Sequence, residues 1–233
     1  MSKKFEIRRD IVLDATPEQV FAAVTADTTG WLFPTPHPSE DGTPDADGNR
    51  ITTWNPPHEY VVRTDGDDGV FNALEHIIEA GEGGTTVVHY VHSGIFVDDW
   101  DTQFDGADKH TDFYLHSLGQ YVKYFPGRST TFVTVDPGSS AGRAPGATEV
   151  LRKELGINAV GDAVRIDALG VDGVVDYLTE HFIGIRGENA LYRFYGREAW
   201  GGPVSAAHHL YAADVDADEA HAAWQRWLDS VYV

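Results

Sequence analysis

The sequence predicts an α+β protein made of two tandem units, each ending in a helix that follows an antiparallel sheet. Alternating apolar residues with short connections predict the sheet of the first unit. Helical spacing of apolar residues over 100–125 predicts its helix. After residue 128 the order strand, helix, meander, helix starts again, with little residue identity between the halves. We therefore place the units at 1–127 and 128–233. The competing interpretation is one domain whose final part forms a cover.

Composition narrows the class of protein. The chain has 233 residues, of which 42% are hydrophobic, as in a packed globular protein. Its 17 Lys and Arg against 37 Asp and Glu give a net charge of −20, which argues against nucleic acid and anionic membranes as partners. Cysteine is absent, and the charged start "MSKKFEIRRD" is not typical of a signal peptide. We expect a cytoplasmic protein. Its acidity is compatible with a high-salt or a GC-rich source.

The first unit begins with a strand in "KFEIRRDIVLDA" and a helix in "TPEQVFAAV". Thr16 and Gln19 have the spacing of a capping box, and Pro17 suits the first helical position. The meander follows in "RITTWNPPHEYVVRT", "GVFNALEHIIEA" and "TTVVHYVHSGIF". Pro56 and Pro57 mark a connection, because neither can donate to a strand ladder. Pro126 and Gly127 end the long helix.

The second unit begins with a strand in "STTFVTVD" and a short helix in "ATEVLRKELG". "AVRIDAL", "GVVDYLTEHFIGIRG", "NALYRFYGRE" and "PVSAAHHLYAA" are predicted as strands. The last helix is predicted in "DVDADEAHAAWQRWLDSVYV", with Asp216 as its cap and Glu219 as the acid at its third position.

Three segments of the first half resemble a known family. They are "RRDIVLDATPEQVFAAVT", "WNPPHEYVVRT" and "GGTTVVHYVHSG", the last followed by the start of the long helix at Trp100. Together they are similar to the SRPBCC superfamily, the START-like helix-grip fold, and within it to the branch of the Hsp ATPase activator homologues. The resemblance implies a curved antiparallel sheet gripping the C-terminal helix, with a ligand cavity between them. It leaves the chemistry open, because fold does not determine function.

Two histidines in "GGTTVVHYVHSG", His89 and His92, lie three residues apart, and the strand predicted here excludes a metal site that they share. Residues three apart on a strand point to opposite faces, so the pair cannot chelate one ion. The resemblance implies that His92 faces the long helix and that His89 faces outward. The outward face is also largely apolar, and we expect the second half of the chain or another subunit to cover it. By the same rule His208 and His209 point to opposite faces.

The function expected from these observations is the binding of a small hydrophobic molecule between sheet and long helix. The candidate binding residues are Trp31, Phe33, Trp54, His76, Tyr90, His92, Phe104, Tyr114 and Leu118. One alternative is a cyclase- or hydrolase-like enzyme with His92 as general base. Another is a protein-interaction module or chaperone cofactor, including a homodimer or an interface between the halves of the chain. No established catalytic signature, metal site or cofactor motif is expected.

Overall fold

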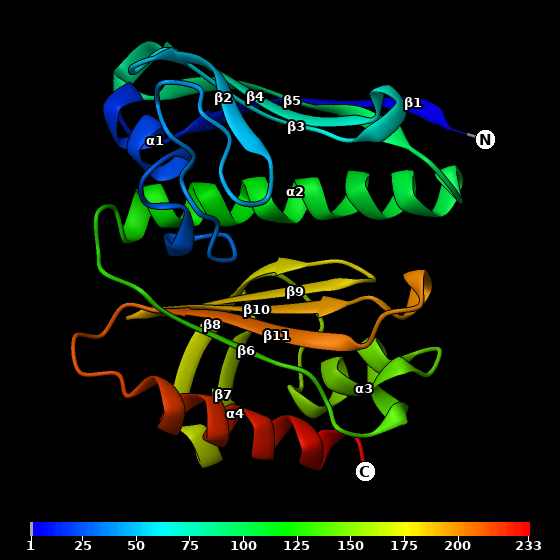
Figure 1. Cartoon of the computed structure of the whole chain (residues 1–233). Coiled ribbons are helices and arrows are strands. Elements are labelled where there is room, and N and C mark those ends of the chain that lie inside the picture. Colours follow the sequence, from blue (N-terminus) through cyan, green and yellow to red (C-terminus); the bar gives the residue numbers. More distant parts are fainter. Residues whose placement is uncertain (1) are drawn as a thin grey trace. The chain divides into compact units, whose positions relative to one another are not determined.

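The computed structural model describes residues 2–233 and divides the chain into two compact units. Unit 1 comprises Met1–Thr28 and Pro34–Gly127, and unit 2 comprises Thr29–Phe33 and Arg128–Val233. Each unit has one antiparallel sheet and a helix at its C-terminal end (Figure 1). The predicted α+β class and the tandem helix-grip architecture are therefore confirmed.

Unit 1 contains a five-stranded sheet in the order β1-β5-β4-β3-β2. Its strands are β1 (Lys3–Leu13), β2 (Asn49–Asn55), β3 (Glu59–Asp65), β4 (Phe71–Ala80) and β5 (Thr86–Phe96). Its helices are α1 (Pro17–Val24) and α2 (Trp100–Tyr124), with short turns of 3-10 helix at η2 (Asp67–Gly69) and η3 (Glu82–Gly84). The helix α2 contacts β1 and β5 and lies along one face of this sheet (Figure 1). We call that face the inner face.

Local signals set the ends of the unit 1 helices. The Thr16 hydroxyl accepts from the Gln19 backbone N–H at 3.3 Å, and the Gln19 side chain accepts from the Thr16 N–H at 3.0 Å. This is the predicted capping box, with Pro17 at the first helical position. The helix α2 ends at Tyr124, two residues before Pro126, where Pro126 and Gly127 were expected to stop it.

Unit 2 repeats the topology of unit 1 with one additional strand, in the order β6-β11-β10-β9-β8-β7. Its strands are β6 (Thr131–Val135), β7 (Ala163–Ile166), β8 (Val171–Leu178), β9 (Phe182–Gly187), β10 (Ala190–Gly196) and β11 (Val204–Leu210). Its helices are α3 (Ala147–Glu154) and α4 (Ala217–Val231), with 3-10 turns η4 (Ser140–Arg143), η5 (Asp167–Leu169) and η6 (Glu198–Trp200). The predicted strand "GVVDYLTEHFIGIRG" is two strands, because Thr179 turns the chain and its hydroxyl accepts from the Phe182 N–H at 3.0 Å.

The core of unit 2 lies between its sheet and α4. Trp224, Trp227 and Leu228 of α4 are at most 9% exposed and pack against strand residues such as Ile185 and Phe194. The side chain of Asp216 caps the helix by accepting from the Glu219 N–H at 3.0 Å, as predicted. The helix is thus fixed both at its first turn and along its apolar face.

The segment Thr29–Phe33 interrupts unit 1 in sequence and groups with unit 2. The Tyr211 hydroxyl donates to the Gly30 carbonyl at 2.5 Å, and His209 Nδ1 lies 2.9 Å from the Thr29 carbonyl oxygen. Within this segment Trp31 is buried, whereas the Phe33 side chain is 51% exposed. The η1 turn (Thr28–Gly30) joins the segment to unit 1.

The outer face of the unit 1 sheet is more polar than the sequence analysis expected. His89 Nδ1 lies 2.6 Å from an Asp10 carboxylate oxygen, and Arg8 pairs with Glu6 at 2.7 Å. Val12 on the same face is 68% exposed. Charged residues therefore alternate with valines on this face, and its cover by the second half of the chain or by another subunit stays a prediction.

Candidate functional site

A row of aromatic side chains crosses the inner face of the unit 1 sheet. Tyr60, His76 and Tyr90 are direct register partners on β3, β4 and β5, so their side chains share one face. The His76 ring centroid lies 6.0 Å from that of Tyr60 and 5.2 Å from that of Tyr90. Trp54 of β2 extends the row, with its ring 6.0 Å from Tyr60. We call these four residues the aromatic row.

His76 is the chemically unusual member of the aromatic row. Its side chain is 4% exposed, and neither ring nitrogen has a hydrogen-bond partner. Burial lowers its pKa to about 4, and proximity to the Tyr60 backbone opposes this shift only in part. His76 is therefore neutral at pH 7 and holds one unused donor and one unused acceptor among aromatic rings.

Tyr90 links the aromatic row to the long helix. Burial raises the pKa of its hydroxyl, and an interaction with Thr111 of α2 lowers it by less. Thr111 donates its own hydroxyl proton to the Ala107 carbonyl at 2.8 Å. The Thr111 side chain therefore connects Tyr90 to α2.

His92 lies on the inner face with His76 but has a different environment. Its Nε2 is 2.7 Å from Oδ1 of Asn72, and its ring meets Phe5 edge-on at 4.9 Å. Burial lowers its pKa to about 4. The neutral ring therefore donates its Nε2 proton to the Asn72 carbonyl, and His92 and His89 do point to opposite faces of β5.

The remaining predicted binding residues do not all converge. Phe104 stacks on Trp100 at 4.7 Å near the start of α2, whereas Tyr114 lies beside His110, with ring centroids 5.9 Å apart. Leu118 is fully buried. The structure thus brings Trp54, His76 and Tyr90 together with a residue that the sequence analysis left out, Tyr60. The alternation in "HEYVV" was the signal that could have identified it.

A second candidate site is a cavity in unit 2, between one end of the sheet and the first half of α4. Its volume is about 520 Å³. It is lined by Ala168, Leu169, Gly170, Val171, Asp172, Glu188, Asn189, Ala190, Tyr192, Leu210, Ala212, Val215, Ala220, Ala223 and Trp224. None of these is among the binding residues predicted from the sequence.

Small side chains explain why this cavity exists. Ala220 and Ala223 face it from α4, and Ala190 faces it from β10, so the helix and sheet meet there without filling the space. Tyr192 and Trp224 form an aromatic wall, with ring centroids 5.4 Å apart. The available signal on the predicted helix was one alanine a full turn before Trp224, Ala220, and another directly before it, Ala223.

His208 lies behind this aromatic wall. Its ring centroid is 4.0 Å from that of Trp224, and its Nδ1 accepts from the Arg193 backbone N–H at 3.1 Å. Burial holds its pKa well below the ordinary value, so Nε2 carries the proton. The adjacent His209 contacts Thr29 from the other face, as the strand rule predicted, and burial lowers its pKa to about 3.

On that other face of the unit 2 sheet, Arg193 and Asp176 form a buried ion pair. The Arg193 guanidinium is fully buried and donates to both oxygens of Asp176, at 3.0 and 2.9 Å. Gly184 lies directly against the pair, and a Cβ there would be 2.9 Å from Arg193 Nη1. The pair is a structural element of the sheet, remote from the cavity lining.

A larger hollow of about 660 Å³ lies beside α3 and includes His181 and Glu198. Both oxygens of Glu198 are engaged, one by the Thr148 N–H at 2.8 Å and one by its hydroxyl at 3.0 Å. The carboxylate therefore serves as a cap for α3. Within residues 2–233, no group of three or more His, Cys, Asp and Glu side chains could hold a metal ion. No helix in the same range is long and apolar enough to cross a membrane.

Comparisons with known proteins give structural likeness only. No protein-family model and no curated protein matches the chain. Among solved structures, the di-domain ARO/CYC BexL from the BE-7585A biosynthetic pathway is 16% identical, with a TM-score of 0.43, and the match covers 98% of this chain and 95% of BexL. DynU16, a protein of the dynemicin biosynthetic locus, is 15% identical with a TM-score of 0.40, over 97% and 95% of the two chains.

The Aha1 dimer from Colwellia psychrerythraea matches half of the chain. It is 19% identical with a TM-score of 0.39, over 51% of this chain and 96% of Aha1. Likeness at this level says nothing about the activity of this protein. The chain consists of two units, each with an antiparallel sheet and a C-terminal helix, and its function has to be argued from its own sites.

Proposed function

We propose that this protein binds a small hydrophobic molecule between sheet and C-terminal helix, in the cavity of unit 2. The observation that carries the proposal is the 520 Å³ cavity walled by Tyr192 and Trp224. Its volume lies within the usual range for small-molecule sites. Most of its lining residues have apolar side chains, and polar atoms contribute about as much of the lining surface as apolar atoms, so the site offers groups that could orient a ligand.

N-phenyl-1-naphthylamine tests the proposal, because this neutral probe becomes fluorescent in apolar surroundings. We expect saturable binding to the whole chain and its loss in Ala223→Leu, which fills the cavity from α4. Ala222→Leu is the matched control, since Ala222 does not line the cavity. Equal binding by the two variants would place the probe elsewhere and count against the proposal.

The ring nitrogens of His76, which have no hydrogen-bond partner, favour a second binding site at the aromatic row. A planar aromatic molecule with one hydroxyl would stack on Trp54 or Tyr60 and bond to the neutral imidazole. The probe is 2-naphthol. We expect His76→Phe to weaken its binding about tenfold, the effect of one hydrogen bond. The same variant should leave binding of 2-methylnaphthalene, which lacks the hydroxyl, unchanged; an equal loss for both would contradict the role of His76.

The enzymatic alternative has less support from geometry. A pKa of about 4 makes His92 a weak base at neutral pH, and its Nε2 proton is committed to Asn72. We retain the predicted placement of unit 1 in the Hsp ATPase activator homologue branch as a proposal, supported by the segments "RRDIVLDATPEQVFAAVT" and "WNPPHEYVVRT". A homodimer is likewise a proposal, testable by sedimentation.

A further inference from the structure

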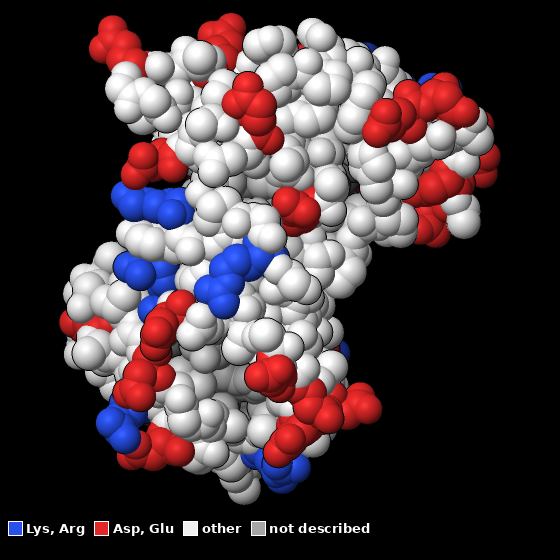
Figure 2. Space-filling view, turned by 90° about the vertical axis from the view of Figure 1, so that its left-hand side faces the viewer, with Lys and Arg blue, Asp and Glu red and all other residues white. Residues whose placement is uncertain are grey.

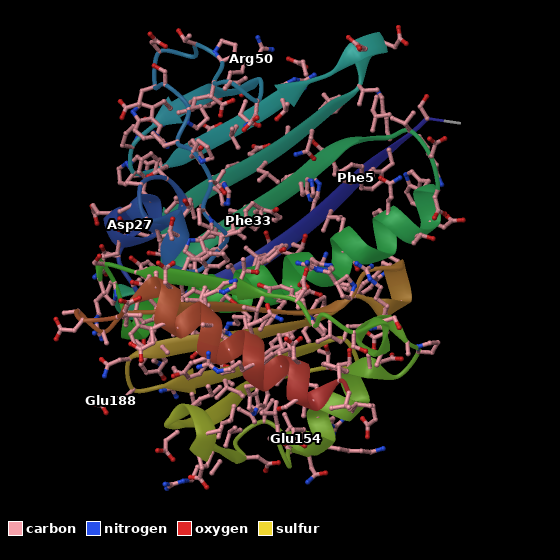
Figure 3. The ribbon with its side chains drawn as sticks, turned by 60° about the horizontal axis from the view of Figure 1, so that its bottom comes forward. Phe5, Asp27, Phe33, Arg50, Glu154 and Glu188 are labelled. Atoms are coloured by element: carbon pink, nitrogen blue, oxygen red, sulfur yellow. The ribbon has the colours of Figure 1, made fainter. Side chains whose placement is uncertain are left out.

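The charged side chains that line the unit 2 cavity are all negative. Asp172 at the start of β8 and Glu188 in the turn between β9 and β10 both line it, and no Lys or Arg does. In Figure 3, Glu188 lies at the end of the β9 and β10 strands, and its side chain extends outward. Burial and the Asp172 charge both raise the pKa of the Tyr192 hydroxyl, so Asp172 lies close enough to act on the aromatic wall.

Basic groups near the cavity offset the rim charge only in part. Arg165 Nη1 forms an ion pair with Asp172 at 3.7 Å while its Nε pairs with Asp167, and because the Asp172 side chain is 72% exposed this pair is weak. Arg128 donates to Oδ1 of Asn189 and to the Tyr211 carbonyl. Neither guanidinium lines the cavity, and Glu188 has no ion-pair partner among the described residues.

The start of α4 is another source of positive potential near the cavity. Its free N–H groups carry a partial positive charge. Asp216 accepts from the Glu219 N–H, and the first turn also contains Asp218. The carboxylates of Asp216, Asp218 and Glu219 outweigh the helix end, and Figure 2 shows Asp and Glu side chains interspersed with Lys and Arg on the visible face. The potential at the mouth is therefore negative.

We infer that the ligand of the unit 2 cavity is an organic cation, an apolar or aromatic body carrying an ammonium group. The apolar body lies between Ala220, Ala223 and the aromatic wall. The ammonium group lies at the rim, near the carboxylates of Asp172 and Glu188 and within reach of the Tyr192 ring face. An exposed carboxylate and an aromatic face both attract a quaternary or protonated amine. This inference rests on the proposed function of the cavity and adds the chemical class.

Three probes of similar size separate charge from shape. They are phenyltrimethylammonium, its neutral carbon isostere tert-butylbenzene, and the anion phenylacetate. Their dissociation constants are measured on the whole ¹⁵N-labelled chain from chemical-shift changes of the tryptophan indole N–H signals at low salt. We expect the cation to bind about tenfold more tightly than the isostere and the anion to bind more weakly than both.

Two double variants test where the preference originates. Asp172→Asn with Glu188→Gln removes the rim charge at constant size and should abolish the tenfold preference while retaining binding of tert-butylbenzene. Asp101→Asn with Glu154→Gln makes the same change in net charge at two residues that do not line the cavity, and Figure 3 shows Glu154 apart from Glu188. The preference should persist in this control.

The outcomes separate the class of ligand from the site. Equal binding of all three probes, each abolished by Ala223→Leu, would overturn the cationic class and leave the proposed function intact. A cation preference that survives loss of the rim charge would also overturn the class. Failure of every probe to bind, N-phenyl-1-naphthylamine included, would overturn both.

Discussion

His76 provides a direct thermodynamic test of the inner face of unit 1. Its pKa is lowered from 6.5 to about 4 because the ring is buried without a hydrogen-bond partner. The unfolded chain takes up a proton at this position as the pH falls through 6.5, and the folded chain does not. The free energy of unfolding must therefore decrease on acidification. His76→Phe preserves an aromatic ring and removes this titration.

The magnitude follows from the two pKa values. Between pH 6.5 and pH 4, each pH unit of acidification lowers the free energy of unfolding by about 1.4 kcal/mol. At pH 5 the loss is therefore about 2 kcal/mol for a pKa shift of this size. The other buried histidines titrate alike in both proteins, and their contributions cancel. The stability of the wild type relative to His76→Phe should thus fall by about 2 kcal/mol between pH 7 and pH 5.

Urea unfolding at the two pH values, followed by far-UV circular dichroism, measures this difference. The two units can unfold in separate steps, and the step that His76→Phe shifts is assigned to unit 1. His58→Phe is the control, because His58 is exposed. In this variant the free energy of unfolding should change between pH 7 and pH 5 by the same amount as in the wild type, to within about 0.5 kcal/mol. A pH-independent difference between the wild type and His76→Phe would refute the account of a buried, unpartnered imidazole.

Three further outcomes concern stability. Arg193→Met should destabilise unit 2 by about 3–5 kcal/mol in urea unfolding, because it removes the guanidinium that donates to both oxygens of the buried Asp176, and adding Asp176→Leu should recover much of this loss; an unrecovered loss would mean that packing dominates. Thr16→Ala should cost about 1 kcal/mol by removing the cap of α1, and a neutral result would show that the helix start does not depend on it. Gly196→Ala should reduce the yield or melting temperature of the protein, since the new Cβ would lie 1.7 Å from Thr148 Oγ1; an unchanged melting temperature would show that Thr148 readily moves.

Local features of the fold could be predicted from the sequence because each depends on neighbouring residues alone. The capping box at Thr16, the cap at Asp216 and the end of α2 near Pro126 follow from side-chain chemistry within one helical turn. The opposite orientations of His89 and His92 follow from the period of a strand.

The sites depend on contacts between distant residues, which the sequence pattern does not specify. Tyr60 faces His76 only because the register of β3 and β4 pairs them, and one residue of slip would turn Tyr60 to the other face. The segment containing Trp31 and Phe33 groups with unit 2 through hydrogen bonds to His209 and Tyr211, about 180 residues away.

The unit 2 cavity could not be predicted for a related reason. It exists because small residues on α4, β10 and η5 meet at one place, and its volume depends on how closely the helix approaches the sheet. Hydrophobic periodicity identifies Ala220 and Ala223 as facing inward, and it gives no measure of the space left in front of them.

The central claim is that a small hydrophobic molecule occupies the cavity between the unit 2 sheet and α4. The most direct measurement is intermolecular nuclear Overhauser effects from bound N-phenyl-1-naphthylamine to assigned protein protons. The account predicts effects to the methyl groups of Ala220 and Ala223 and to the Trp224 ring. Effects confined to unit 1, or none to these three residues at saturation, would contradict it.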